Sequence, residues 1–324
     1  MERVDVAIVG GGPAGLSAAL VLGRCCRTVV VIDAGQQRNR SAHAIHGYLT
    51  RDGLAPAELL EAARTELATY GEIRLLDGLV TEIAGSHGAF EIRTLEGSAV
   101  RSRRVLLATG VVDVVPGIPG LGELFGSSVH HCPHCDGYEY RGQAIGVYGQ
   151  AGPGVEAVLA MLAWSDNVVL FTDGRALSPE DRTTCDEQGV VVNEQRIIRL
   201  DGRDRRLERV VLADGSSVPR AALFLVAGQR EQSDLAKQLG CEIDAGGVVV
   251  TDDHGVTTVP GIYAAGDASI GEQMVVVAAA QGAIAATKIH TSLWEEDLRA
   301  IRSRRSSRSS SGTGSGPVRE VAPR

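Results

Sequence analysis

Residues 4–33 constrain the fold of this chain more than any other segment. An apolar run at 4–9 predicts a buried strand, residues 13–24 predict a helix, and residues 28–32 predict a second apolar strand. A glycine-rich turn joins the first strand to the helix. A strand, a helix and a strand in this order form a right-handed βαβ unit, and such a unit belongs to a parallel sheet.

The turn carries the pattern G-x-G-x-x-G at Gly10, Gly12 and Gly15. The first glycine permits the tight turn, the second lets a pyrophosphate approach the backbone, and the third lets helix and strand pack closely. Asp33 ends the next strand and can accept hydrogen bonds from ribose hydroxyls. Together these features predict a dinucleotide site. A tight turn without a ligand is the alternative.

A second unit of the same kind follows later in the chain. Residues 144–148 predict a strand, a helix is expected near 155–164, and residues 168–171 predict another strand. The two units indicate an internal duplication. The second begins after the first sheet should be complete, and the segment 261–267 resembles the last strand of that first sheet. We therefore predict an α/β fold with two Rossmann-like three-layer nucleotide-binding domains, the second inserted into the first.

The predicted junctions lie near Pro116 and near Ser233. Residues 1–115 and 234–301 then form the first nucleotide-binding domain, and residues 116–233 form the inserted pyridine-nucleotide-like domain. From residue 302 the chain is rich in Arg, Ser and Gly and cannot bury apolar surface. Residues 302–324 are therefore predicted to be a disordered, solvated tail rather than a contact for nucleic acid or membrane.

Cys132 and Cys135 lie three residues apart in the inserted domain and can close a small disulfide ring. Such a pair in an intracellular protein is typical of electron chemistry. His130, His131 and His134 can each take or give a proton near neutral pH, and Asp136 adjoins the second cysteine. A zinc site is one alternative, although no second Cys-x-x-Cys is present. Two inert core cysteines are the other.

Composition narrows the class of protein. The chain of 324 residues has a formal net charge of −8, which argues against a nucleic-acid partner. No apolar run approaches the roughly 20 residues that span a bilayer, and no signal peptide is recognised. We therefore expect a cytoplasmic protein without a membrane partner, in which thiols stay reduced. The four remaining cysteines are expected to be buried as small apolar residues: Cys25, Cys26, Cys185 and Cys241.

Two further segments favour FAD over NAD in the first site. Thr109 and Gly110 follow a predicted strand, and Gly266 and Asp267 follow a later one. Both segments recur in flavoproteins that have two such domains. Asp267 could bond the ribityl chain or pyrophosphate of FAD, or simply cap the helix that follows.

These motifs resemble the low-molecular-weight thioredoxin reductase family of FAD flavoproteins, over roughly residues 3–300. The resemblance rests on five segments in order, at 10–15, 108–110, 132–137, 259–267 and 279–283. It implies tightly held FAD, a homodimer, and an inserted domain that carries the cysteine pair.

The resemblance also implies roles for single residues. Cys135 would be the flavin-proximal thiol, Cys132 the exchange thiol and Asp136 a proton donor. The family's Arg-Gln-Ala run, which lines the flavin, appears here as Gln273-Met274-Val275 and implies an altered flavin environment. The residues expected to bind the cofactor are Gly10, Gly12, Pro13, Ala14, Gly15, Asp33, Ala34, His46, Thr109, Gly110, Gly266, Asp267, Met274 and Val275.

The second fingerprint departs from the family pattern. Family members have G-x-G-x-x-A there, but Ala151 replaces the glycine that permits close approach of a phosphate. Thr172 follows Gly149 at the interval at which Asp33 follows Gly10, and NADPH-using reductases place a His-Arg-Arg run there. Here Asp173 would repel a 2′-phosphate. NADPH binding is predicted to be poor, and NADH could bind only with Asp173 on its ribose.

That pattern also resembles a branch of the family that oxidises dithiols, such as those acting on holomycin or gliotoxin. These proteins keep FAD and the cysteine pair, have little use for a pyridine nucleotide, and pass electrons to dioxygen. We therefore predict an FAD-dependent thiol–disulfide oxidoreductase that oxidises a small-molecule dithiol. One alternative is an NAD(P)H-dependent reductase of a thioredoxin-like protein or small disulfide. The other is a non-catalytic redox sensor.

Overall fold

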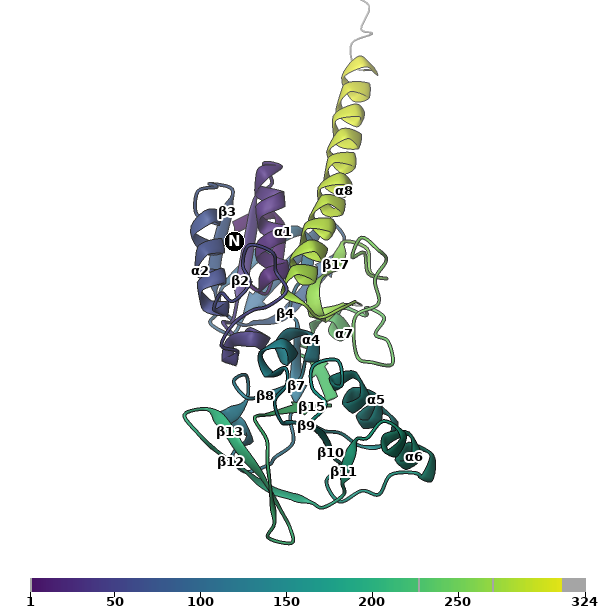
Figure 1. Cartoon of the computed structure of the whole chain (residues 1–324). Coiled ribbons are helices and arrows are strands. Elements are labelled where there is room, and N and C mark those ends of the chain that lie inside the picture. The colour runs from purple at the N-terminus through teal and green to yellow at the C-terminus, as the bar shows by residue number, and fades with distance from the viewer. Residues whose placement is uncertain (1, 227, 270, 311–324) are drawn as a thin grey trace, which may run out of the picture.

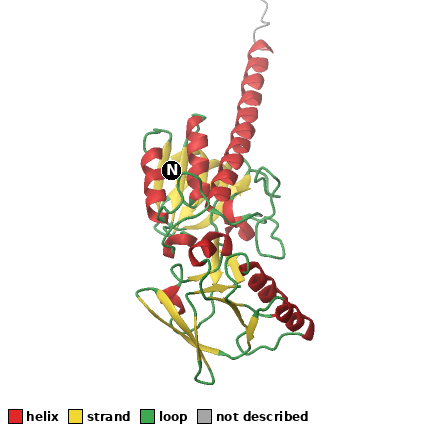
Figure 2. Ribbon diagram, viewed as in Figure 1, coloured by secondary structure: helices red, strands yellow, loops and turns green. Residues whose placement is uncertain are grey.

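The computed structural model describes residues 2–226, 228–269 and 271–310, which form two lobes (Figures 1 and 2). The first sheet has the strand order β3-β2-β1-β6-β5-β4, with β17 also paired to β6. Its strands are β1 (Glu2–Val9), β2 (Val29–Asp33), β3 (Ile73–Asp77), β4 (Val80–Ser86), β5 (Ala89–Thr94), β6 (Ala99–Leu107) and β17 (Ile262–Ala264). The main sheet of the second lobe is parallel, and that of the first is parallel except for β4 and β5, which pair antiparallel.

Strand β1 lies at the centre of the first sheet, parallel to β2 and to β6. Side chains alternate across a strand, so Val6 and Ile8 enter one apolar cluster while Ala7 and Val9 enter the other. The first cluster is covered by helices, and the second by residues of β4 and β5 and by residues that follow the inserted lobe. The helices of this lobe are α1 (Pro13–Arg24), α2 (Pro56–Leu67), α7 (Leu235–Gln238) and α8 (Val275–Ser310), with short 3₁₀ turns η1 (Arg38–Ser41) and η3 (Gly266–Ala268).

The second lobe repeats the three-layer plan. Its parallel sheet has the order β11-β10-β9-β15-β8, and a three-stranded antiparallel sheet, β12-β13-β14, covers one face. Helices α5 (Ala151–Met161) and α6 (Pro179–Glu187) cover the other face. The strands are β8 (Val129–His130), β9 (Ile145–Tyr148), β10 (Val168–Phe171), β11 (Val191–Asn193), β12 (Ile197–Arg203), β13 (Arg206–Leu212), β14 (Ser217–Pro219) and β15 (Ala222–Leu225).

Two antiparallel strands join the lobes, β7 (Val111–Val114) and β16 (Gly228–Glu231). The short elements α3 (Leu121–Leu124), α4 (Pro133–Asp136) and η2 (Gly137–Tyr140) follow β7 in the chain, and Figure 1 places α4 between the lobes. Because β17 returns to pair with β6, the second lobe is an insertion into the first. The predicted fold class is confirmed. The domain limits at residues 116 and 233 stay a prediction.

The predicted tail is wrong in part, because α8 continues to Ser310. Each residue added to an existing helix gains a backbone hydrogen bond, and arginine is a good helix former. The helix therefore extends past its packed portion into the Arg/Ser-rich segment. Residues 311–324, the rest of the predicted tail, lie outside the part of the chain that the structure describes.

The burial predicted for the isolated cysteines is right for two of the four. Cys185 and Cys241 are buried, but Cys25 is half-buried and Cys26 is exposed. Helix α1 ends at Arg24, and Cys26 then adopts a left-handed conformation with φ of 55°. The chain thereby leaves the helix toward solvent. Within the described residues, no helix is long and apolar enough to cross a membrane.

Helix α8 approaches α1 so closely that Gly282 has no room for a side chain. A Cβ atom there would lie 2.0 Å from the carbonyl oxygen of Ala14, which is helix backbone next to the glycine-rich turn. The packing of α8 therefore supports the turn itself.

Replacing Gly282 with Val should push α8 away from α1 and lower the free energy of unfolding by about 3 kcal/mol. Thr287→Val puts the same side chain at an exposed position of the same helix and should change stability little. Thermal or urea unfolding of both variants measures the difference. Equal stabilities would contradict the contact.

Candidate active site

A long cleft lies at the carboxyl ends of the first sheet and reaches the cysteine segment of the second lobe. It is where a dinucleotide binds in open α/β sheets. Among the predicted cofactor-binding residues, all but Gly15 line it: Gly10, Gly12, Pro13, Ala14, Asp33, Ala34, His46, Thr109, Gly110, Gly266, Asp267, Met274 and Val275. His131, Cys135 and Asp136 line it as well, whereas Cys132 and His134 do not.

The glycine-rich turn has the shape that a pyrophosphate needs. Gly10 has φ of 108°, and a Cβ atom there would lie 2.2 Å from the carbonyl oxygen of Ala108. At Gly12 a Cβ atom would meet nothing within 4 Å, so space remains beside the backbone. Gly15 lies behind the turn, packed against the carbonyl oxygen of Gly10. This cradle at the start of α1 fits the phosphates of FAD.

Asp33 is nearly buried at the end of β2, in the place predicted for a ribose contact. Its Oδ2 accepts hydrogen bonds from Gln37 Nε2, at 2.8 Å, and from Arg64. Its Oδ1 accepts a single bond of 3.2 Å from the backbone N–H of Gly35. A carboxylate oxygen has two lone pairs, so Oδ1 can still accept a ribose hydroxyl.

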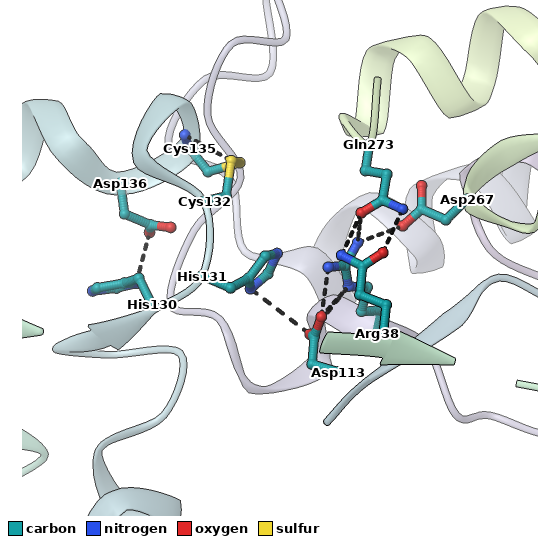
Figure 3. The surroundings of a disulfide bond; sticks show 10 residues. Arg38, Asp113, His130, His131, Cys132, Cys135, Asp136, Asp267 and Gln273 are labelled. Atoms are coloured by element: carbon teal, nitrogen blue, oxygen red, sulfur yellow. Dashed lines mark hydrogen bonds and ion pairs between the residues drawn. A yellow bond between two sulfur atoms is a disulfide. The ribbon is translucent and has the colours of Figure 1, made fainter. Parts of the chain in front are cut away.

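Arg38, in η1, connects the cleft to the strands that join the lobes (Figure 3). Its Nε and Nη2 donate to Asp113 in β7, at distances of 2.5 to 3.1 Å. Its Nη1 donates to Asp267 at 3.0 Å and to Gln273 at 2.6 Å. Gln273 also exchanges hydrogen bonds of 2.7 Å with Gln229 in β16. The Arg38 and Asp113 side chains are only 11% and 6% exposed, so their charges are compensated mainly by each other.

The cysteine pair forms a disulfide at the start of α4, with the two Cα atoms 5.3 Å apart. Pro133 occupies the first turn of the helix, where its missing N–H costs nothing. Cys132 is the N-cap residue, and its Sγ accepts from the backbone N–H of Cys135 at 3.2 Å. Cys135 lines the cleft and Cys132 does not. A zinc ion at this pair would need free thiolates, whereas both sulfurs are bonded to each other.

His131 lies beside the disulfide and next to the Arg38–Asp113 pair. Its Nδ1 is 3.7 Å from Asp113 Oδ2. Burial lowers the pKa of His131, the Arg38 charge lowers it further, and Asp113 opposes them. The imidazole is therefore unprotonated near neutral pH and is able to accept a proton.

Asp136 contacts a different histidine. Its Oδ1 is 3.2 Å from Nδ1 of the buried His130, whose Nε2 is 3.3 Å from the hydroxyl of Tyr140. Burial raises the pKa of Tyr140 to about 12, and its hydroxyl donates to the carbonyl oxygen of Ser127 at 2.7 Å. That donation leaves the tyrosine oxygen able to accept from Nε2 of His130, and in that tautomer Nδ1 and the Asp136 carboxyl would share a further proton.

The side chains of His134 and His46 have partners other than the disulfide and the Arg38–Asp113 pair. His134 is exposed, with its ring edge-on to Trp164 at 5.9 Å between centroids. His46 lines the cleft, with Nδ1 3.5 Å from Asp52 and Nε2 3.7 Å from Glu139. His46 thus contacts both its own loop and the segment after the disulfide.

Arg38 and Asp113 were not predicted as site residues, and His130 was considered as a proton carrier but not included in the predicted site. Arg38 is separated from Asp113 by 75 residues and from Asp267 by 229. Nothing in the local pattern around Arg38 distinguishes it from the exposed Arg40. A signal existed only for His130, which stands in the same His-rich segment as the predicted residues.

The second fingerprint keeps its packing but not its binding features. Ala151, where the fingerprint has glycine, is left-handed with φ of 49°. Asp173, expected on a ribose, accepts from the hydroxyl of Tyr148 at 3.1 Å and from the backbone N–H of Ile197 at 2.9 Å. One bond goes to each carboxylate oxygen, so this side chain serves the lobe's own structure.

Comparisons with known proteins agree with this geometry. The profile of the family described as pyridine nucleotide-disulphide oxidoreductase matches residues 4–283. Thioredoxin reductase tcpT of Claviceps purpurea is 34% identical over 276 residues, covering 82% of this chain and 86% of its own. A probable thioredoxin reductase of Arthroderma benhamiae is 31% identical over 301 residues, covering 83% of this chain and 74% of its own.

Solved structures show the same relationship. HlmI is 40% identical with a TM-score of 0.89, covering 95% of this chain and 97% of its own. The putative thioredoxin reductase TrxB from Bacillus anthracis is 33% identical with a TM-score of 0.87, covering 91% of this chain and 99% of its own.

The chain therefore belongs to the pyridine nucleotide-disulphide oxidoreductase family. Within that family it is thioredoxin reductase-like, as its sequence indicated, and it is an FAD-dependent disulfide oxidoreductase. The FAD that the family binds fits the cleft described above. The residues that would hold FAD are those of the glycine-rich turn, Asp33 and the segment around Asp267.

Charge changes on the two sides of His131 should move its pKa in opposite directions. Arg38→Gln removes a positive charge and should raise the pKa of His131, whereas Asp113→Asn removes a negative charge and should lower it. Titration of the imidazole signals by NMR measures both. Arg40→Gln, an exposed change in the same turn, is the control. Shifts of the same sign would contradict the arrangement.

Proposed function

We propose that this protein oxidises a small-molecule dithiol to a disulfide and passes the electrons through FAD to dioxygen. The observation that carries the proposal is the placement of the Cys132–Cys135 disulfide, with Cys135 lining the FAD cleft and Cys132 outside it. One sulfur is thereby placed for the cofactor and the other for a substrate. The resemblance to dithiol-oxidising members of the family supports the direction.

The reaction begins when a substrate thiolate attacks Sγ of Cys132. The Cys132–Cys135 bond breaks, Cys135 leaves as a thiolate, and a mixed disulfide forms between the substrate and Cys132. The second substrate thiolate then attacks the substrate's own sulfur and releases Cys132. The substrate departs as a disulfide, and its two electrons remain on the cysteine pair. The chemistry that FAD supplies when bound is transfer of these electrons to dioxygen, which becomes hydrogen peroxide.

His131 is the proposed base for the substrate thiols, in preference to His134. The unprotonated imidazole of His131 adjoins Cys132 and lines the cleft, whereas His134 is exposed against Trp164. Asp136 is the proposed proton donor. The proton that it would share with His130 is held close to the Cys135 thiolate that forms in the first step.

The main alternative function is that of an NAD(P)H-dependent reductase, which would act on a thioredoxin-like protein or a small disulfide. The names of the relatives suggest this alternative. The methyl group of Ala151, at a position where the fingerprint has glycine, favours the oxidase, because it opposes the close approach of a nucleotide phosphate. A non-catalytic redox sensor is the third alternative, and a Cys132→Ser variant that keeps FAD but loses the turnover of the unmodified protein would argue against it.

A dithiol such as dithiothreitol should release hydrogen peroxide with purified holoenzyme in air, without any nicotinamide. Cys132→Ser should lower this rate by at least about a thousandfold, because the attacked sulfur is gone, while the flavin absorbance is retained. Cys26→Ser removes an exposed thiol elsewhere and should leave the rate unchanged. Absence of peroxide with a range of dithiols would exclude the oxidase, and fast anaerobic bleaching of the flavin by NADH or NADPH would favour the reductase.

We also propose that the protein is a cytoplasmic homodimer. Trp294 is 53% exposed and Ile301 is 47% exposed on α8, while Leu49 is 87% exposed in a loop. Exposed apolar side chains of this size are common at subunit contacts. Light scattering of the holoenzyme should give twice the chain mass of 34.0 kDa, and a monomer would disprove the dimer.

A further inference from the structure

A second cavity, of about 420 Å³, lies in the inserted lobe. It opens at the carboxyl ends of β9 and β15 and runs along α5, and most of its lining residues are apolar, although its surface is shared about equally by polar and apolar atoms. Its polar lining residues are His131, Glu156 and Gln229. A cavity of this size suits a small organic molecule. A thiol borne on the surface of a folded protein could reach it only on a protruding loop.

This cavity and the FAD cleft lie on either side of the disulfide segment. Cys135 lines the cleft, whereas His131 and Pro133, the two neighbours of Cys132, line the second cavity. Among the described lining residues, His131 is the one that both hollows share. A molecule in the second cavity would therefore contact the proposed base and both chain neighbours of Cys132.

The family's name implies a pyridine nucleotide at this end of the sheet, but the residues present do not fit one. Ala151 places a methyl group where the fingerprint needs glycine, and Asp173 is bonded within the lobe. Glu156 puts a carboxylate into the cavity lining, where it would repel a pyrophosphate. The same features do not oppose an uncharged ligand.

We propose that this cavity is the binding site for the dithiol substrate, an uncharged molecule with apolar surface, and that it takes the place of the family's nucleotide site. The proposal rests on the proposed function. In it, a substrate thiol loses its proton to His131, its sulfur bonds to Sγ of Cys132, and the disulfide bond to Cys135 breaks. The electron pair of that bond leaves with Cys135 toward the FAD cleft.

The test uses a probe that does not require oxidase turnover. In the Cys135→Ser holoprotein, Cys132 is a free thiol, and its alkylation by N-phenylmaleimide can be followed by mass spectrometry of its peptide. Ala157→Trp fills the cavity from the half-buried side of α5 and should slow this alkylation at least tenfold. Ala160→Trp places the same side chain on the exposed side of the same helix and should leave the rate unchanged.

A second arm measures turnover with the cysteine pair intact. Ala157→Trp should raise KM for 1,2-benzenedimethanethiol at least tenfold, with flavin absorbance unchanged. Val226→Trp, at the partly exposed rim, should repeat both effects if the first variant folds poorly. Alkylation at the unmodified rate in both Trp variants, or protection of Cys132 by millimolar NADH or NADPH, would overturn the proposal. Slowed alkylation without any dithiol oxidation would support access through the cavity and refute the oxidase.

Discussion

The buried ion pair between Arg38 and Asp113 is the contact on which the active-site geometry depends. Asp113 belongs to a strand that joins the lobes, and Arg38 belongs to the lobe that binds FAD. The same guanidinium reaches Asp267 and Gln273, at the far edge of the cofactor cleft. A single cation thus fixes the wall of the cleft, the connecting strand and the electrostatic surroundings of His131. Removal of Arg38 would leave the buried carboxylate of Asp113 without this cation, whereas removal of Asp113 would leave Arg38 paired with Asp267 alone.

Around this pair, the structure separates the tasks of the two sulfurs. Cys135 lines the cleft beside the Asp136–His130 contact, and Cys132 lies toward the inserted lobe between two residues that line the second cavity. His131 and His130 have different partners, because one side chain is held beside Asp113 and the other beside Asp136 and Tyr140. In the proposed mechanism, these adjacent residues serve opposite steps of a thiol–disulfide exchange.

The sequence was informative wherever local pattern determines structure. Strand β1, helix α1 and the glycine-rich turn follow from apolar periodicity and a backbone that only glycine can adopt, and helix α1 was predicted to the residue. Arg38 could not be found in this way, because its partners come from distant parts of the chain. The exposure of Cys26 depends on the side toward which the chain leaves α1. The length of α8 depends on helix propagation beyond its packed turns, which composition alone does not reveal.

The strands β7 and β16 carry a contact that resists rotation of one lobe against the other, the ion pair between Asp113 and Arg38. A rotation that carried β7 away from η1 would separate Asp113 from the guanidinium of Arg38, so this ion pair opposes such a rotation. Electron transfer from Cys135 needs no rotation of this kind, since this residue already borders the FAD cleft. Turnover can then proceed without waiting for an excursion of the whole lobe.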